Sequence, residues 1–154
     1  MKSLLSLLVI LLWSPLYAAP AVDQRPPLPG GAACVMAKWQ GNTLDYALVM
    51  GKDHPVEAQE EAGRMLAAKG YDSYKKNVDV RHAQGLTNLP HAYVIVLKTT
   101  YKTYLGKDRS SYGCGFSADS HDDALWEAIR DLQRFSWGWV PDRDGYQIIQ
   151  KTRY

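Results

Sequence analysis

The residues of this chain best suited to covalent chemistry are its cysteines, Cys34 and Cys114. Cys114 stands between Gly113 and Gly115, and His121 follows closely in the sequence. A thiolate activated by a histidine can attack a carbonyl carbon, so this pattern would fit a small envelope cysteine hydrolase. The amino-terminal residues, described below, predict export, and in an exported chain a single pair of cysteines usually forms a disulfide. We therefore expect a Cys34–Cys114 disulfide and keep a hydrolase centred on Cys114 and His121 as the alternative.

The other ionisable residues do not form a pattern that predicts catalysis. The four histidines are His54, His82, His91 and His121. They are dispersed, with no pair at the spacings that bind zinc from one helix or strand. The acidic residues near His121 lie at the N-terminus of a predicted helix, where the helix dipole favours carboxylates. They are Asp119, Asp122 and Asp123. The sequence contains neither a G-x-S-x-G motif nor a glycine-rich phosphate loop. We expect no catalytic residue, no metal ion and no cofactor.

An aromatic loop is the strongest candidate for binding. Residues 135–146 contain Trp137 and Trp139, separated by one glycine, and end at Tyr146. Tryptophan and tyrosine combine a large apolar surface with a polar atom, which suits them to recognise partners. We expect these residues to bind a partner protein in preference to a sugar. The competing interpretation is that the tryptophans cover the open end of a small core.

The amino-terminal residues have the features of a secretory signal peptide. Lys2 precedes an apolar run at 4–12, and small residues follow, so we predict a signal peptide over residues 1–21, cleaved after Ala18 or Ala21. The run is shorter than the roughly 20 residues that a membrane-spanning helix needs, which argues against stable membrane insertion. Residues 22–31, rich in proline and glycine, lead into a single domain over residues 32–154. We expect a periplasmic or secreted protein.

Two segments of the chain, residues 46–66 and 112–132, are similar to each other. The identical positions are Tyr46/Tyr112, Asp53/Asp119, Ala58/Ala124, Glu61/Glu127, Ala62/Ala128, Arg64/Arg130 and Leu66/Leu132. Each segment predicts a strand, a turn and an amphipathic helix. With the flanking strands, this pattern predicts a duplicated β-β-α-β unit, over about 34–84 and 92–152. The expected fold class is α+β, with a mixed or antiparallel sheet of about six strands and two helices on one face.

Residues 92–101 form the most strand-like segment, with Val94 and Val96 on one face and Tyr93 and Ile95 on the other. If both helices cover one face of a single sheet, the apolar residues of its other face need a cover. We expect residues 137–140, which include both tryptophans of the loop, either to fold over that face or to form its rim.

A hairpin followed by a helix rich in alanine and glutamate resembles a group of small exported bacterial domains of unknown function. The residues that carry the resemblance are Ala58, Glu61 and Ala62 in one helix and Ala124, Glu127 and Ala128 in the other. The resemblance implies no catalytic residues. The formal net charge of +2 also gives no electrostatic basis for binding nucleic acid. We therefore expect an exported, non-enzymatic binding protein, for example an inhibitor or immunity factor acting on an extracellular or periplasmic protein.

Overall fold

The structure is a computed structural model, which describes residues 30–39, 42–71, 79–81 and 85–154. The predicted signal peptide and most of the predicted lead-in lie outside these residues. Gly31, expected in the lead-in, instead begins the first strand and is buried. The elements are β1 (Gly31–Trp39), β2 (Asn42–Lys52), α1 (Pro55–Ala68), β3 (Asp79–Arg81), β4 (Leu86–Thr87), β5 (Tyr93–Lys102), β6 (Asp108–Ser117), α2 (His121–Phe135), α3 (Pro141–Asp144) and β7 (Gln147–Arg153).

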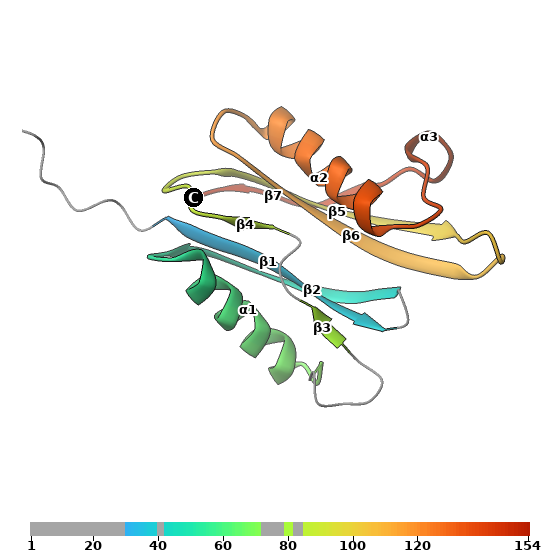
Figure 1. Ribbon diagram of the computed structural model, residues 1–154. Helices are drawn as coiled ribbons and strands as arrows, with labels where there is room; N and C mark the ends of the chain where they lie inside the picture. Colours follow the sequence, from blue (N-terminus) through green and yellow to red (C-terminus); the bar gives the residue numbers. More distant parts are fainter. Residues whose placement is uncertain (1–29, 40–41, 72–78, 82–84) are drawn as a thin grey trace, which may run out of the picture.

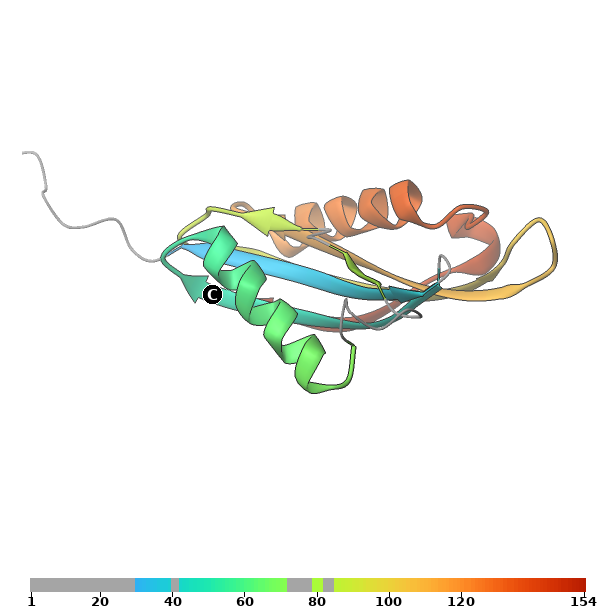
Figure 2. The same ribbon diagram turned by 60° about the horizontal axis from the view of Figure 1, so that its bottom comes forward.

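The strands form two antiparallel sheets, which lie face to face with one helix on each outer side (Figures 1 and 2). The first sheet has the order β2-β1-β3, with β4 also pairing with β1, and the second has the order β6-β5-β7. The α+β class is confirmed, but the expected single sheet with both helices on one face is wrong. Each hairpin carries its helix on one face and presents apolar residues on the other, so the two free faces bury each other.

The two sheets are built in the same way. The first strand of each, β1 or β5, lies in the centre, the second strand lies on one side, and the strand after the helix lies on the other. Helix residues at matching positions are fully buried, and they are Ala58, Ala62 and Leu66 in α1 and Ala124, Ala128 and Leu132 in α2. Two other apolar residues of α1, Val56 and Met65, are exposed. The halves therefore share an arrangement, whereas their origin by duplication stays a prediction.

The layer between the sheets contains the disulfide. Cys34 of β1 is bonded to Cys114 of β6 with a Cα–Cα distance of 6.4 Å, as predicted. Met36 and Val96 pack around the bond from opposite sheets. The first sheet thus covers the face of β5 that carries Val96, so the expectation that residues 137–140 cover this face or form the rim of an open face is wrong.

Two glycines of β6 set the position of α2. A Cβ atom at Gly113 or Gly115 would collide with the carbonyl oxygen of Ala128 or Ala124 of the helix. Helix α2 therefore lies directly on β6, which is an edge strand of its sheet. As a result, side chains from one flank of α2 reach the free edge of β6. The glycines on either side of Cys114 thus serve close helix packing.

Candidate functional site

The structure separates the two tryptophans of the predicted binding loop. Trp139 is only 6% exposed and packs in the core beneath α2 with Ile129 and Leu132. Its indole nitrogen donates a hydrogen bond of 3.0 Å to the carbonyl oxygen of Gly145. Trp137 is 85% exposed. A flat platform made of both rings is therefore not formed, and Trp139 closes the core, which is the competing interpretation of this residue.

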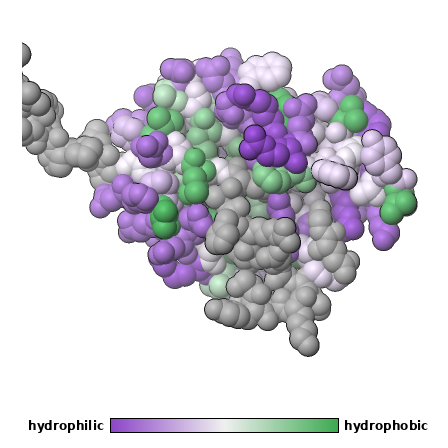
Figure 3. All heavy atoms as spheres, in the orientation of Figure 1, coloured by the Kyte–Doolittle hydropathy of each residue, from purple (hydrophilic) through white to green (hydrophobic). Residues whose placement is uncertain are grey.

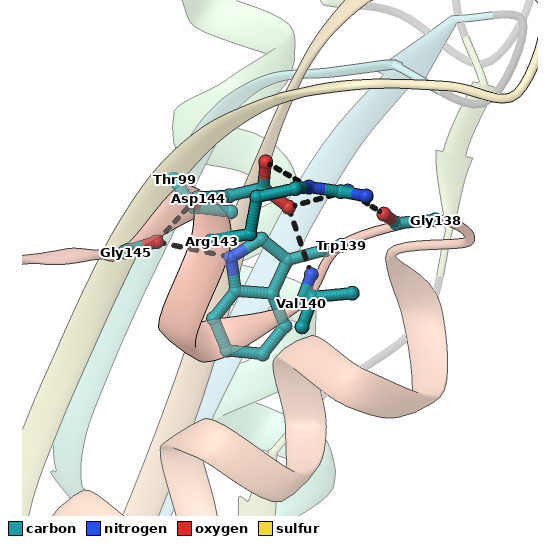
Figure 4. Close-up of polar contacts among 7 residues, drawn as sticks. All are labelled: Thr99, Gly138, Trp139, Val140, Arg143, Asp144 and Gly145. Carbon is teal, nitrogen blue, oxygen red and sulfur yellow. Dashed lines mark hydrogen bonds and ion pairs between the residues drawn. The ribbon is translucent and has the colours of Figure 1, made fainter.

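The loop that carries Trp137 is held by polar contacts around α3 (Figure 4). The backbone nitrogen of Val140 donates to the Asp144 carboxylate at 2.8 Å, and the Thr99 hydroxyl of β5 donates to the carbonyl oxygen of Gly145 at 2.8 Å. Arg143 donates to Asp144 and to the carbonyl oxygen of Gly138. The hydrogen bond from Arg143 lowers the pKa of Asp144, so this carboxylate is ionised at neutral pH. Trp137 is thus presented by an ordered loop.

The turn between β5 and β6 is a second projecting feature, whose exposed apolar residues were not among the predicted site residues. The hairpin extends beyond the rest of the molecule in both ribbon views (Figures 1 and 2). Its turn is closed by hydrogen bonds from the backbone nitrogens of Thr103 and Gly106, and Gly106 has the positive φ of 71° that the turn needs. At its end, Tyr104 is 96% and Leu105 83% exposed. Two adjacent apolar residues before a turn glycine were the signal available in the sequence.

These two loops lie side by side. Tyr104 on the hairpin and Gly138 on the α3 loop line the same pocket of about 370 Å³, together with Arg143 and Asp144. We call Tyr104, Leu105 and Trp137 the tip surface. In Figure 3, pale and green spheres gather at this end of the molecule, where the β5–β6 turn lies. A neighbouring pocket of about 630 Å³ is lined mainly by polar side chains, namely Asn42, Thr100, Tyr101, Lys102, Asp108, Arg109, Ser110, Arg143 and Asp144.

Tyr146, the third predicted binding residue, follows α3 in the chain. It is partly exposed and lines a separate pocket of about 370 Å³ with Asp144 and Lys98. Asp144 lines all three of these pockets, so Tyr146 is near the tip surface without sharing a pocket with Tyr104.

A largely buried carboxylate, that of Asp131, lies beside the disulfide. The carboxylate of Asp131 on α2 accepts a hydrogen bond of 2.9 Å from the backbone nitrogen of Cys114, at the free edge of β6. Burial raises the pKa of Asp131 to about 7, although this hydrogen bond and the positive charges of Lys38 and Arg134 act in the opposite direction. In the sequence, Asp131 is indistinguishable from the solvated acidic residues of an amphipathic helix.

The cysteine–histidine pair does not form a catalytic arrangement. Cys114 is bonded to Cys34 and offers no thiolate. The ring of His121 packs edge-on against Tyr93, and its Nε2 atom lies 3.0 Å from the carbonyl oxygen of Thr152. Among the described residues, no group of three or more His, Cys, Asp or Glu side chains is placed to hold a metal ion.

Each helix within the described ranges is too short or too polar to span a bilayer. Comparisons with models of protein families, with curated proteins and with solved structures find no match to this chain.

Proposed function

We propose that this chain is an exported, non-enzymatic binding protein that recognises a partner protein through its tip surface. The observation that carries the proposal is the exposure of Tyr104, Leu105 and Trp137 on two adjacent, hydrogen-bonded loops. These are the most exposed large apolar side chains among the described residues, and the next, Trp126, is 64% exposed. Exposed apolar groups that cluster on ordered loops are typical of interaction sites.

The energetics of such a surface favour a protein partner. Transfer of one large apolar side chain from water to an apolar environment contributes about 1.5–3 kcal/mol, and aromatic anchors often dominate the affinity of interfaces. The backbone hydrogen bonds of the turn and the contacts of Arg143 and Asp144 order both loops before binding. Little conformational entropy is then lost when a partner binds.

The surroundings of the tip surface have the character of an interface rim. Side chains of both signs line the pocket beside it, including Lys102, Asp108 and Arg109. A rim of polar residues around apolar anchors is the usual composition of protein–protein interfaces. A projecting hairpin fits a concave partner surface, such as the active-site cleft of an enzyme, so an inhibitor or immunity factor is the specific form of this proposal.

Export is part of the proposal and is supported by the disulfide, because such bonds persist in oxidising compartments. The alternative hydrolase would need Cys114 to be reduced before it could act. Alkylation of the native protein distinguishes the two functions. A binding protein stays unmodified until a reductant is added, whereas rapid modification of Cys114 would support the hydrolase.

Capture of the partner tests the proposal. The mature chain, a tip variant (Tyr104→Ser, Leu105→Ser, Trp137→Ser) and a control variant are immobilised and exposed to envelope extract of the source cell. The control, Trp126→Ser, removes an exposed aromatic ring from α2. We expect a protein that the wild type and the control retain and the tip variant loses. Equal retention by all three chains would contradict the role of the tip surface.

A further inference from the structure

A fourth pocket, which we call the α2 pocket, shares no lining residue with the three pockets near the tip surface. Its volume is about 270 Å³. Residues of α2, β4 and β6 line it. The lining residues are Gly85, Leu86, Thr87, Cys114, Gly115, Phe116, Glu127, Arg130, Asp131 and Arg134.

Asp131 supplies the negative charge of this pocket. Its Oδ2 atom is occupied by the backbone N–H of Cys114. Its other carboxylate oxygen makes no hydrogen bond to any residue that the structure describes. This oxygen is not fully buried. Asp131 lines the pocket. This oxygen is therefore available to a donor that enters the pocket.

Arg134 supplies the matching positive charge. Within the described part of the chain, its guanidinium forms neither a hydrogen bond nor an ion pair, although its charge is close enough to act on Asp131. The other two charges of the pocket, Arg130 and Glu127, form an ion pair with each other. The pocket therefore offers one carboxylate oxygen and one guanidinium that can pair with a ligand, together with the aromatic ring of Phe116.

We propose that the α2 pocket binds a small zwitterion of the α-amino-acid class. The ligand carboxylate pairs with Arg134, whose planar guanidinium suits a carboxylate. The ligand ammonium donates to the free oxygen of Asp131, and the ligand side chain lies toward Phe116. The volume corresponds to about nine water molecules at about 30 Å³ each, which leaves room for a small amino acid.

The ionisation of Asp131 gives the site a pH dependence. The charged groups that face this carboxyl are Arg134, Arg130 and Glu127 on α2 and Lys38 on β1. Because burial raises the pKa of Asp131 to about 7, the carboxyl is partly protonated near neutrality. An ammonium group needs the ionised form. The affinity for the ligand therefore rises as the pH increases through about 7. Below that pH, binding releases a proton from the Asp131 carboxyl.

Titration calorimetry and amide chemical shifts test the proposal on the disulfide-bonded protein. The probes are L-alanine, N-acetyl-L-alanine, which lacks the positive charge, and L-alaninamide, which lacks the negative charge. We expect L-alanine to bind at least about tenfold more tightly than either derivative. We also expect the amide signal of Cys114 to shift, because its N–H donates to Asp131. Absence of binding at millimolar concentration, or equal binding of the three compounds, would overturn the proposal.

Variants locate the site. Asp131→Asn keeps an oxygen that can accept the Cys114 N–H, and Arg134→Gln changes a residue without a described structural contact, so both should fold. Each is expected to weaken L-alanine binding at least about tenfold. Arg64→Gln on α1, an exposed arginine outside the pocket, is the matched control and should bind as the wild type does. Unchanged binding by Arg134→Gln would overturn the assignment.

Discussion

The rings of Tyr46 and Tyr112 pack against each other with their centroids 5.3 Å apart. Tyr46 lies on β2 and Tyr112 on β6, at matching positions of the two halves. The hydroxyl of Tyr46 also donates a hydrogen bond of 3.0 Å to Gln150 of β7. The inner faces of the two sheets are thus joined by aromatic contact, by a hydrogen bond and by the Cys34–Cys114 disulfide.

The disulfide should make a large contribution to stability. It closes a loop with a sequence separation of 80 residues. In the loop-entropy model such a bond contributes on the order of 4–5 kcal/mol. We expect the double variant Cys34→Ser, Cys114→Ser to lose most of this free energy of unfolding, measured by urea denaturation. A loss below about 1 kcal/mol would show that the unfolded chain gains little freedom when the bond is absent.

A glycine-to-alanine pair tests the close packing of α2 on β6. At Gly115, an added methyl group would collide with the carbonyl oxygen of Ala124, so Gly115→Ala should destabilise the protein by about 1–3 kcal/mol or more. Gly63 on α1 has no atom within 4 Å of the added position. Gly63→Ala should therefore stabilise the protein by roughly 0.5–1 kcal/mol. Thermal unfolding of both variants provides the measurement, and similar effects of the two substitutions would contradict the packing.

Asp131 should make the stability of the wild type depend on pH. Its pKa in the folded state, about 7, exceeds the ordinary value of 3.8, so folding favours the protonated form. The stability from this group is complete below about pH 4 and falls as the pH rises toward 7, by at most about 4 kcal/mol. In Asp131→Asn this part of the pH dependence should disappear, as seen from denaturation midpoints between pH 4 and 8. An identical pH profile for both proteins would contradict the raised pKa.

The two tryptophans of the α3 loop should behave differently. Trp139 is a core residue, so Trp139→Ala should cost about 3–5 kcal/mol. Trp137 is exposed, and Trp137→Ala should change the free energy of unfolding by no more than about 0.5 kcal/mol. Equal effects on the melting temperature would mean that Trp137 also supports the core.

Local patterns in the sequence predicted the elements better than they predicted the arrangement. The two hairpin-and-helix segments and the disulfide were predicted from residue type and spacing. The face-to-face packing of two sheets could not be predicted. Apolar residues on the inner faces, such as Val96 and Met36, could be buried equally well by a second sheet, a helix or a loop. The short strand β4 has no strand pattern of its own, since only its pairing with Ala32 and Ala33 defines it.

The candidate sites were harder to predict than the elements. Trp137 and Trp139 look equivalent in the sequence, but the structure exposes the first and buries the second, with Gly138 at a φ of 98° between them. The properties of Asp131 depend on its burial beside β6, and no sequence pattern records that burial. Tyr104 and Leu105 could have been predicted from the sequence, but the more unusual pair of tryptophans was chosen as the binding candidate.

Site-specific photo-crosslinking in the source cell tests the central claim, that the tip surface contacts a partner protein, most directly. A photoreactive amino acid replaces Tyr104 in one variant, Trp137 in a second and Trp126 in a third, the last serving as the control on α2. The account predicts one adduct of the same additional mass from positions 104 and 137 and none from position 126. The claim would be contradicted by an adduct from position 126 alone. It would also be contradicted if position 104 and position 137 both gave no adduct.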